Sequence, residues 1–298
     1  MSFKINFELQ NIDKIIPFGE NRDSMHWFAL TDGLLWINVG KDIIYEYSDA
    51  AIEYWKEARR YNDYYLARFC EDISQTFNYI YESIPKYLYD NIEDFEEMIN
   101  CWEDQWENDH PDPSDAIYSE FEGNIPRLLK KLQDSQPDIS DADYDAAYDI
   151  FLDAHTKIKT WYNDRIFDSG HLVGGPYIGF FRYADKIKIL WDGRGKLENG
   201  AYIWTSPYGC YEMDYSDFVS EVQHFFDNFL MKMDIQVEEA LNKEWGNVFL
   251  DKPGLKEEHI RRRKFFNDHV SLLLQEDKES TEWESVKQIY NEIKHDIK

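Results

Sequence analysis

The chain has 298 residues, of which 43% are hydrophobic and 17% aromatic, and this composition supplies enough apolar surface for a folded core and excludes a disordered chain. Its formal net charge of -27 repels nucleic-acid phosphates and anionic membranes, so we expect no direct nucleic-acid binding, no membrane association and a basic protein partner. The three cysteines are far apart and no apolar stretch approaches the roughly 18 residues of a membrane span, which predicts a cytoplasmic protein without disulfides.

The first residues predict an antiparallel meander. Asp32-Gly33 and Gly40-Lys41 are dipeptides typical of tight turns, because Asp and Gly tolerate the positive φ that such turns need. They separate runs of aromatic and β-branched residues. The three predicted strands of the meander are 26–31, 34–39 and 43–47. Residues 3–9 predict a separate strand, and residues 11–19 a connection between it and the meander.

A helix follows the meander. Apolar residues recur at three- and four-residue steps from Leu66 to Ile84, which places them on one face of a helix. Asn62 or Asp63 is expected to cap this helix, and Pro85 to end it.

The middle of the chain is predicted to be helical and acidic, with helices over 94–108, 115–133 and 140–162. Residues 90–153 carry 20 Asp and Glu against 3 Lys and Arg, which indicates either a solvated helical face or a surface for a basic protein. Two tryptophans four residues apart, within a row of carboxylates, have the composition of an interface anchor with a charged rim, although packing against a neighbouring helix explains them too. The candidate partner-binding residues are Trp102, Glu103, Asp104, Trp106, Glu107 and Asp109.

The last third repeats the plan of the first. Strand patterns at 177–183, 186–191 and 201–205 predict a second meander, and Ser216-Asp217 opens a long amphipathic helix. Two more helices are expected at 255–277 and 280–295.

These elements predict an α+β fold with two antiparallel meanders, each followed by amphipathic helices. We expect one domain over residues 1–250, with meander-helix halves at about 1–90 and 165–245 and the helical segment 91–164 between them. Residues 251–298 are expected to form a C-terminal helical extension. The sequence leaves open whether the two halves arose by duplication, and it does not fix the oligomeric state.

The sequence contains no phosphate-binding loop, dinucleotide-binding motif, nucleophile elbow or metal-binding His and Cys motif, so we expect no cofactor and no catalytic residues. One local cluster combines acid, hydroxyl and imidazole groups on a short connection, namely Asp164, Asp168, Ser169 and His171. Such groups suit a hydrolase if the imidazole reaches a nucleophile, but turn chemistry explains the same residues.

A short basic cluster, Arg261 to Lys264, lies beside Phe265 and Phe266 in a helix with acidic neighbours. It indicates either a solvated or internally paired helix face or a patch that contacts an anion. The sequence does not choose between these roles.

Two blocks of aromatic and turn residues carry a resemblance. They are His26-Trp27-Phe28-Ala29-Leu30-Thr31-Asp32-Gly33 with Trp36-Ile37, and Gly175-Pro176, Ile178, Phe180-Phe181-Arg182 and Ile189-Leu190-Trp191-Asp192. The chain thereby resembles a family of uncharacterised bacterial proteins that contain a domain of unknown function. The resemblance covers most of residues 3–235, leaves the last two helices outside, and implies a role like that of immunity proteins encoded near toxin genes.

Three functions follow as hypotheses. The first is a non-catalytic acidic binding protein, most concretely an immunity-type inhibitor of a basic protein toxin. The second is a DNA mimic that occupies a nucleic-acid-binding protein, and the third is a hydrolase with a site near Asp168 and His171.

Overall fold

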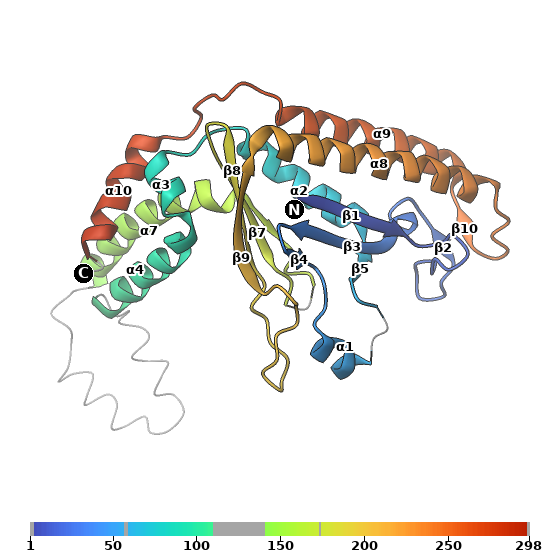
Figure 1. The fold of residues 1–298 in the computed structure, drawn as a ribbon, viewed down its shortest axis with the longest axis horizontal. Coiled ribbons are helices and arrows are strands. Elements are labelled where there is room, and N and C mark those ends of the chain that lie inside the picture. Colours follow the sequence, from blue (N-terminus) through green and yellow to red (C-terminus); the bar gives the residue numbers. More distant parts are fainter. Residues whose placement is uncertain (1–2, 57–58, 110–140, 173, 297–298) are drawn as a thin grey trace. The chain divides into compact units, whose positions relative to one another are not determined.

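The computed structural model describes residues 3–56, 59–109, 141–172 and 174–296 (Figure 1). The chain forms two compact units. Unit 1 comprises Met1–Tyr89 and Asp164–Ser280, and unit 2 comprises Asp90–Asn163 and Thr281–Lys298.

This division differs from the expected one of a domain over 1–250 and an extension over 251–298. Leu255 and Phe266 belong to the hydrophobic core of unit 1, so the first of the two C-terminal helices is part of that unit. The segment after Ser280 joins unit 2 instead. The division therefore falls within the expected extension, between its two helices.

A four-stranded antiparallel sheet, sheet 1, forms the first half of unit 1. Its central strand β3 pairs with β1 along one edge and with both β4 and β5 along the other, at opposite ends. Buried residues alternate along β3, which gives the sheet one face toward the core. The strands are β1 (Lys4–Leu9), β3 (Asp32–Val39), β4 (Asp42–Ile44) and β5 (Asn62–Tyr65).

The expected hairpin at Asp32-Gly33 is wrong. Both residues begin β3, and the residues before them form the short helix η1 (Ala29–Thr31) instead of a strand. Gly33 is opposite Leu9 of β1, where a side chain would collide with the carbonyl oxygen of Glu8. This glycine allows two strands to approach closely, whereas Gly40, with φ of +60°, makes the expected turn into β4.

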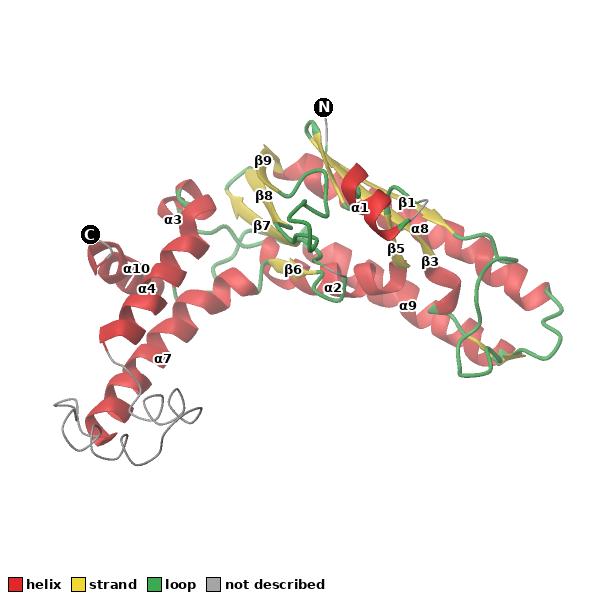
Figure 2. Cartoon of the chain, turned by 90° about the horizontal axis from the view of Figure 1, so that it is seen from below, coloured by secondary structure: helices red, strands yellow, loops and turns green. Residues whose placement is uncertain are grey.

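Three helices pack on the core of unit 1. The expected helix α2 is confirmed from Leu66 to Ile80, but Asn62 and Asp63 lie in β5 and do not cap it. Helices α8 and α9 run side by side, and α8 contacts β1 while α2 contacts β3 (Figures 1 and 2). The helices of this unit are α1 (Asp49–Trp55), α2 (Leu66–Ile80), α3 (Lys86–Asp90), which ends at the unit boundary, α8 (Tyr215–Asn242) and α9 (Lys252–Leu272).

The second sheet of unit 1, sheet 2, has strand order β6-β7-β8-β9 and antiparallel pairing throughout. Its strands are β6 (Ile166–Asp168), β7 (Tyr177–Tyr183), β8 (Lys186–Asp192) and β9 (Tyr208–Asp214). Strands β7 and β8 confirm the strands expected at 177–183 and 186–191, whereas β6 and β9 were not expected. The strand expected at 201–205 is wrong, because Trp204 forms only an isolated bridge with Tyr47, on which its ring stacks at 4.7 Å between centroids. That segment pairs with the residues that follow β4 instead of extending either sheet.

A small parallel ladder also pairs β2 (Ser24–Met25) with β10 (Phe249–Leu250). It ties the loop before η1 to the connection between α8 and α9. The residues expected as a strand at 26–31 therefore follow this ladder and enter the core, where Trp27 is fully buried.

Unit 2 is built from helices. They are η2 (Ile92–Asp94), α4 (Phe95–Asp109), α7 (Asp141–Asn163) and α10 (Trp283–Asp296), and the last three lie against one another. The helices expected at 94–108, 140–162 and 280–295 are thus confirmed, while the one expected at 115–133 lies outside the described residues. Their apolar faces form a core of Ile92, Phe95, Ile99, Ile158, Trp161, Tyr162, Trp283, Val286, Tyr290 and Ile293.

The α+β class is confirmed by these helices and antiparallel sheets. Within the described ranges, the structure contains no helix with the length and apolarity that a membrane crossing requires.

Candidate functional site

The two tryptophans of the acidic segment point into unit 2. Trp106 stacks on Phe151 of α7 with 4.3 Å between ring centroids, and Trp102 lies 4.8 Å from the same ring. Both tryptophans therefore hold α4 against α7, as expected for helix packing. They are partly exposed at the edge of this contact.

Glu103 also faces α7. Its carboxylate accepts a hydrogen bond from Lys159 Nζ at 2.8 Å and contacts His155. Partial burial by itself raises the pKa of Glu103, but the hydrogen bonds and positive charges of Lys159 and His155 outweigh it and lower the pKa. Glu103 therefore remains ionised and serves the contact between helices.

The remaining candidates, Asp104, Glu107 and Asp109, are exposed. They continue an acidic outer face of η2 and α4 that also includes Glu93, Asp94, Glu96 and Glu97. By sequence, unit 2 carries 24 acidic and 8 basic residues, against 35 and 24 in the larger unit 1. The acidic excess is thus concentrated in the smaller unit, where the inner face of α4 is apolar and the outer face anionic.

The connection with Asp168, Ser169 and His171 is a structural turn. Asp168 ends β6 and accepts a hydrogen bond from the Gly170 N–H at 2.6 Å. The Ser169 hydroxyl is buried and donates to the carbonyl oxygen of Pro176 at 2.5 Å. Both side chains thus satisfy backbone groups of the turn.

His171 does not activate the serine. Its ring packs against Tyr64 with 5.0 Å between centroids, and within the described part of the chain no hydrogen bond joins it to Ser169. Asp164 is next to the buried Arg165, and burial raises its pKa. The structure therefore does not assemble these residues into a nucleophile with a base.

The same turn nevertheless lines a small pocket. Ser169 and His171 share it with Tyr45, which the sequence did not single out, and with Asn62, which the sequence proposed only as a helix cap. The sequence signal was weak, since a tyrosine at the end of a strand pattern and an asparagine before a helix are both common. No group of three His, Cys, Asp or Glu side chains that could hold a metal occurs among the described residues.

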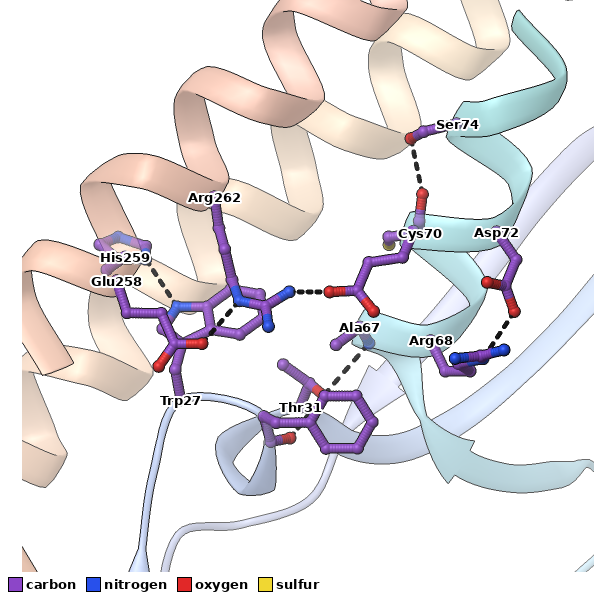
Figure 3. Close-up of polar contacts among 12 residues, drawn as sticks. Trp27, Thr31, Ala67, Arg68, Cys70, Asp72, Ser74, Glu258, His259 and Arg262 are labelled. Atoms are coloured by element: carbon purple, nitrogen blue, oxygen red, sulfur yellow. Dashed lines mark hydrogen bonds and ion pairs between the residues drawn. The ribbon is translucent and has the colours of Figure 1, made fainter.

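The basic cluster on α9 is mostly paired within unit 1. Figure 3 shows Arg262 lying over the indole of Trp27, with its guanidinium carbon 4.4 Å from the ring centroid. Its Nε donates to Glu258 at 2.9 Å, and its Nη1 pairs with Glu71 of α2. Of the other members, Arg263 pairs with Asp234 and Lys264 with Asp268.

A hydrogen bond at the edge of the Trp27 indole also holds this side chain in place. Its indole N–H donates to His259 Nδ1 at 3.0 Å (Figure 3). On the other side of the imidazole, His259 Nε2 lies 2.8 Å from Asp234 Oδ1. Because Nδ1 accepts, His259 carries its proton on Nε2 and donates it to Asp234. Arg262 and Arg263 of the cluster therefore have an internal role, because they hold α9 against Trp27, α2 and α8.

Comparison with known proteins gives one match. The model of a family of unknown function (DUF5984) matches residues 4–289. No curated protein and no solved structure matches the chain. The match extends through α9 and into α10, so the expectation that the last two helices lie outside the family pattern is wrong.

Proposed function

From the premise that this chain belongs to the DUF5984 family of unknown function, we propose that it is a non-catalytic binding protein that holds a basic partner against the acidic outer face of unit 2. An immunity-type inhibitor of a basic protein toxin is the most concrete form of this proposal. The observation that carries it is the separation of charge between the two units.

Two features support the proposal. Apart from Glu103, the carboxylates of α4 are exposed on the outer face, because the apolar inner face of this helix packs on α7. A concentrated negative potential accelerates encounter with a cationic protein, and electrostatic steering can raise association rates to about 10⁸ M⁻¹s⁻¹. Rapid association suits an inhibitor.

Two alternative functions receive different support from this structure. A DNA mimic would also use this acidic face, and its partner would release it when duplex DNA is added. A hydrolase near Asp168 and His171 receives less support, because the Ser169 hydroxyl is committed to a backbone carbonyl.

The test uses isothermal titration of the full-length chain with the product of the adjacent gene. The variant Glu97→Gln/Asp104→Asn/Glu107→Gln removes three exposed charges of the outer face. We expect binding about tenfold weaker and a flatter salt dependence between about 50 mM and about 300 mM.

The matched control is Glu238→Gln/Glu239→Gln/Glu244→Gln, which removes three exposed charges from unit 1. It should bind like the parent chain. Equal weakening by both triple variants would show that only net charge matters, and no weakening by either would reject the acidic face. Release of the bound chain by duplex DNA would favour the DNA-mimic alternative.

A further inference from the structure

Trp27 and His259 contact each other within unit 1, and their hydrogen bond fixes the protonation state of the imidazole. The Trp27 indole N–H donates to His259 Nδ1 at 3.0 Å (Figure 3). Since an indole nitrogen donates and does not accept, Nδ1 of His259 must carry a lone pair and no proton. His259 Nε2, which lies 2.8 Å from Asp234 Oδ1, carries the single ring proton. The contact with Trp27 therefore requires a neutral imidazole.

Uptake of a second proton by His259 is incompatible with this contact. Because Nε2 is already protonated, the added proton can only go to Nδ1, the atom that accepts from Trp27. Two N–H groups would then point at each other, and neither can accept a hydrogen bond. Trp27 is 0% exposed, and the loss of its acceptor is unfavourable for a buried donor. Protonated His259 must therefore separate from the Trp27 indole N–H.

Charged groups from three helices and from the loop of Trp27 surround this pair. Asp234 of α8 attracts a positive charge on His259, although Arg263 already shares that carboxylate. On the Trp27 side, the guanidinium carbon of Arg262 lies 4.4 Å from the centroid of the indole ring, and its charge repels a protonated imidazole. A protonated ring is thus drawn toward Asp234 and away from Trp27. The surrounding titratable and charged groups are Glu71 of α2, Asp234 of α8, Glu258, Arg262 and Arg263 of α9, and His26 next to Trp27.

We propose that His259 is a pH-sensitive switch at the contact of α8 and α9 with Trp27. The neutral imidazole bridges Trp27 and Asp234, whereas the protonated imidazole keeps Asp234 and releases Trp27. The change is local, because Phe266 and Val270, farther along α9, belong to the buried core of unit 1. This switch goes beyond the binding of a basic partner and does not involve the acidic face of unit 2.

Release of Trp27 acts on an open groove of unit 1. Trp27 forms part of the lining of this groove, together with His26, Leu255 and Arg261. These side chains come from the loop after β2 and from the first turns of α9. Since the hydrogen bond between Trp27 and His259 joins the same two segments, its loss alters the shape of the groove.

The first test follows the Trp27 indole N–H by NMR in the full-length chain from about pH 8 to about pH 5, the range over which imidazoles commonly take up a proton. Trp27→Phe identifies the indole signal, and the nitrogen resonances of the imidazole report protonation of His259 Nδ1. We expect the indole signal to move in step with that protonation. We also expect the protection of the indole N–H from hydrogen exchange, corrected for the intrinsic effect of pH, to fall about tenfold. An imidazole that stays neutral throughout this range overturns the proposal, and so does an indole signal that does not respond when Nδ1 is protonated.

The second test uses His259→Asn, which removes the titration. An asparagine side chain carries an oxygen at the same distance along the chain as Nδ1, so it can accept from Trp27, but it binds no proton in this range. We expect the Trp27 indole signal of this variant to be independent of pH. A signal that titrates as it does in the parent chain overturns the proposal.

His26→Gln is the matched control, because His26 is another imidazole in the lining of the groove that contains Trp27. The indole signal of this variant should titrate like that of the parent chain. Loss of the titration in His26→Gln would assign the effect to His26 and reject His259 as the switch. Should His259→Asn fail to fold, the comparison of imidazole and indole signals in the parent chain decides the question.

Discussion

The sequence suggested His171 as a candidate for catalysis, but in the structure its neighbours only shift the pKa of its imidazole. One face of its ring lies on Tyr64, and partial burial lowers its pKa below 6.5, although the negative charge of Asp72 opposes this effect. The folded chain therefore binds a proton at His171 more weakly than the unfolded chain does. Stability contributed by this group is complete above pH 6.5 and declines as the pH falls through 6.5 toward the folded pKa.

The prediction is that the His171 imidazole titrates below 6.5 in an NMR pH titration, and that Asp72→Asn lowers its pKa further. Asp72→Asn removes the charge that favours the protonated ring. In parallel, His171→Gln should reduce the loss of stability between about pH 7 and about pH 5, measured by denaturant unfolding. A titration midpoint at or above 6.5 would contradict this account.

Among the secondary-structure elements, the strand that begins near Gly33 illustrates which features the sequence could predict and which it could not. Strand β7 was predicted with its correct bounds from local patterning, and the Gly40-Lys41 turn from its dipeptide. Asp32-Gly33 has an equally strong turn signature, yet it begins β3, because the neighbouring strand β1 needs the space that glycine leaves. A local sequence pattern carries no information about how closely another strand approaches.

Gly33→Ala tests this interpretation. The added methyl group would meet the backbone of Glu8 in β1, which cannot move without breaking the pairing of the strands. We expect a loss of about 3 kcal/mol in the free energy of unfolding, measured by chemical denaturation. Gly200→Ala is the control, since Gly200 has φ of +84° and open space around it, and should lose only about 1 kcal/mol. Similar losses in both variants would contradict the close-approach explanation.

The contacts of the candidate site were likewise hidden from the sequence, because they join residues that are far apart along the chain. Spacing correctly placed Trp102 and Trp106 on one helical face, but it did not identify Phe151 as the ring they contact, which lies 45 residues or more along the chain. Tyr45 and Asn62 lacked any local sign of their shared pocket. Strand β9 was missed because Tyr208 to Asp214 does not alternate clearly between apolar and polar residues.

Across the whole molecule, a buried ion pair marks the points where the chain leaves and re-enters unit 1. Arg165 Nη2 lies 2.9 Å from Glu82 Oε2, and the two side chains are 0% and 1% exposed. Glu82 Oε1 also accepts from the Ser280 backbone N–H at 2.7 Å. Glu82 therefore fastens together two distant segments next to the unit boundaries at 163/164 and 280/281.

Glu82→Gln should destabilise unit 1 by about 3–5 kcal/mol, because it removes the carboxylate that pairs with the buried Arg165 guanidinium. Hydrogen exchange should show the loss of protection in the backbone of β6 and β7. The control is Asp13→Asn, which removes the partner of Lys243 at a position where the Asp13 side chain is 78% exposed, and this variant should lose less than about 1 kcal/mol. Comparable losses in the two variants would show that the burial of the ion pair is unimportant.

The interleaved order of the units has a consequence during synthesis on the ribosome. Residues 1–89 emerge first, but sheet 2, α8 and α9, which complete their core, arrive only after the acidic segment 90–163. That segment cannot complete its own core until α10, the last helix of unit 2, has been synthesised. Neither unit can complete its core when only its first half has been synthesised, so two partly folded regions coexist on the growing polypeptide. The high negative charge of segment 90–163 opposes its aggregation with neighbouring nascent chains during this time.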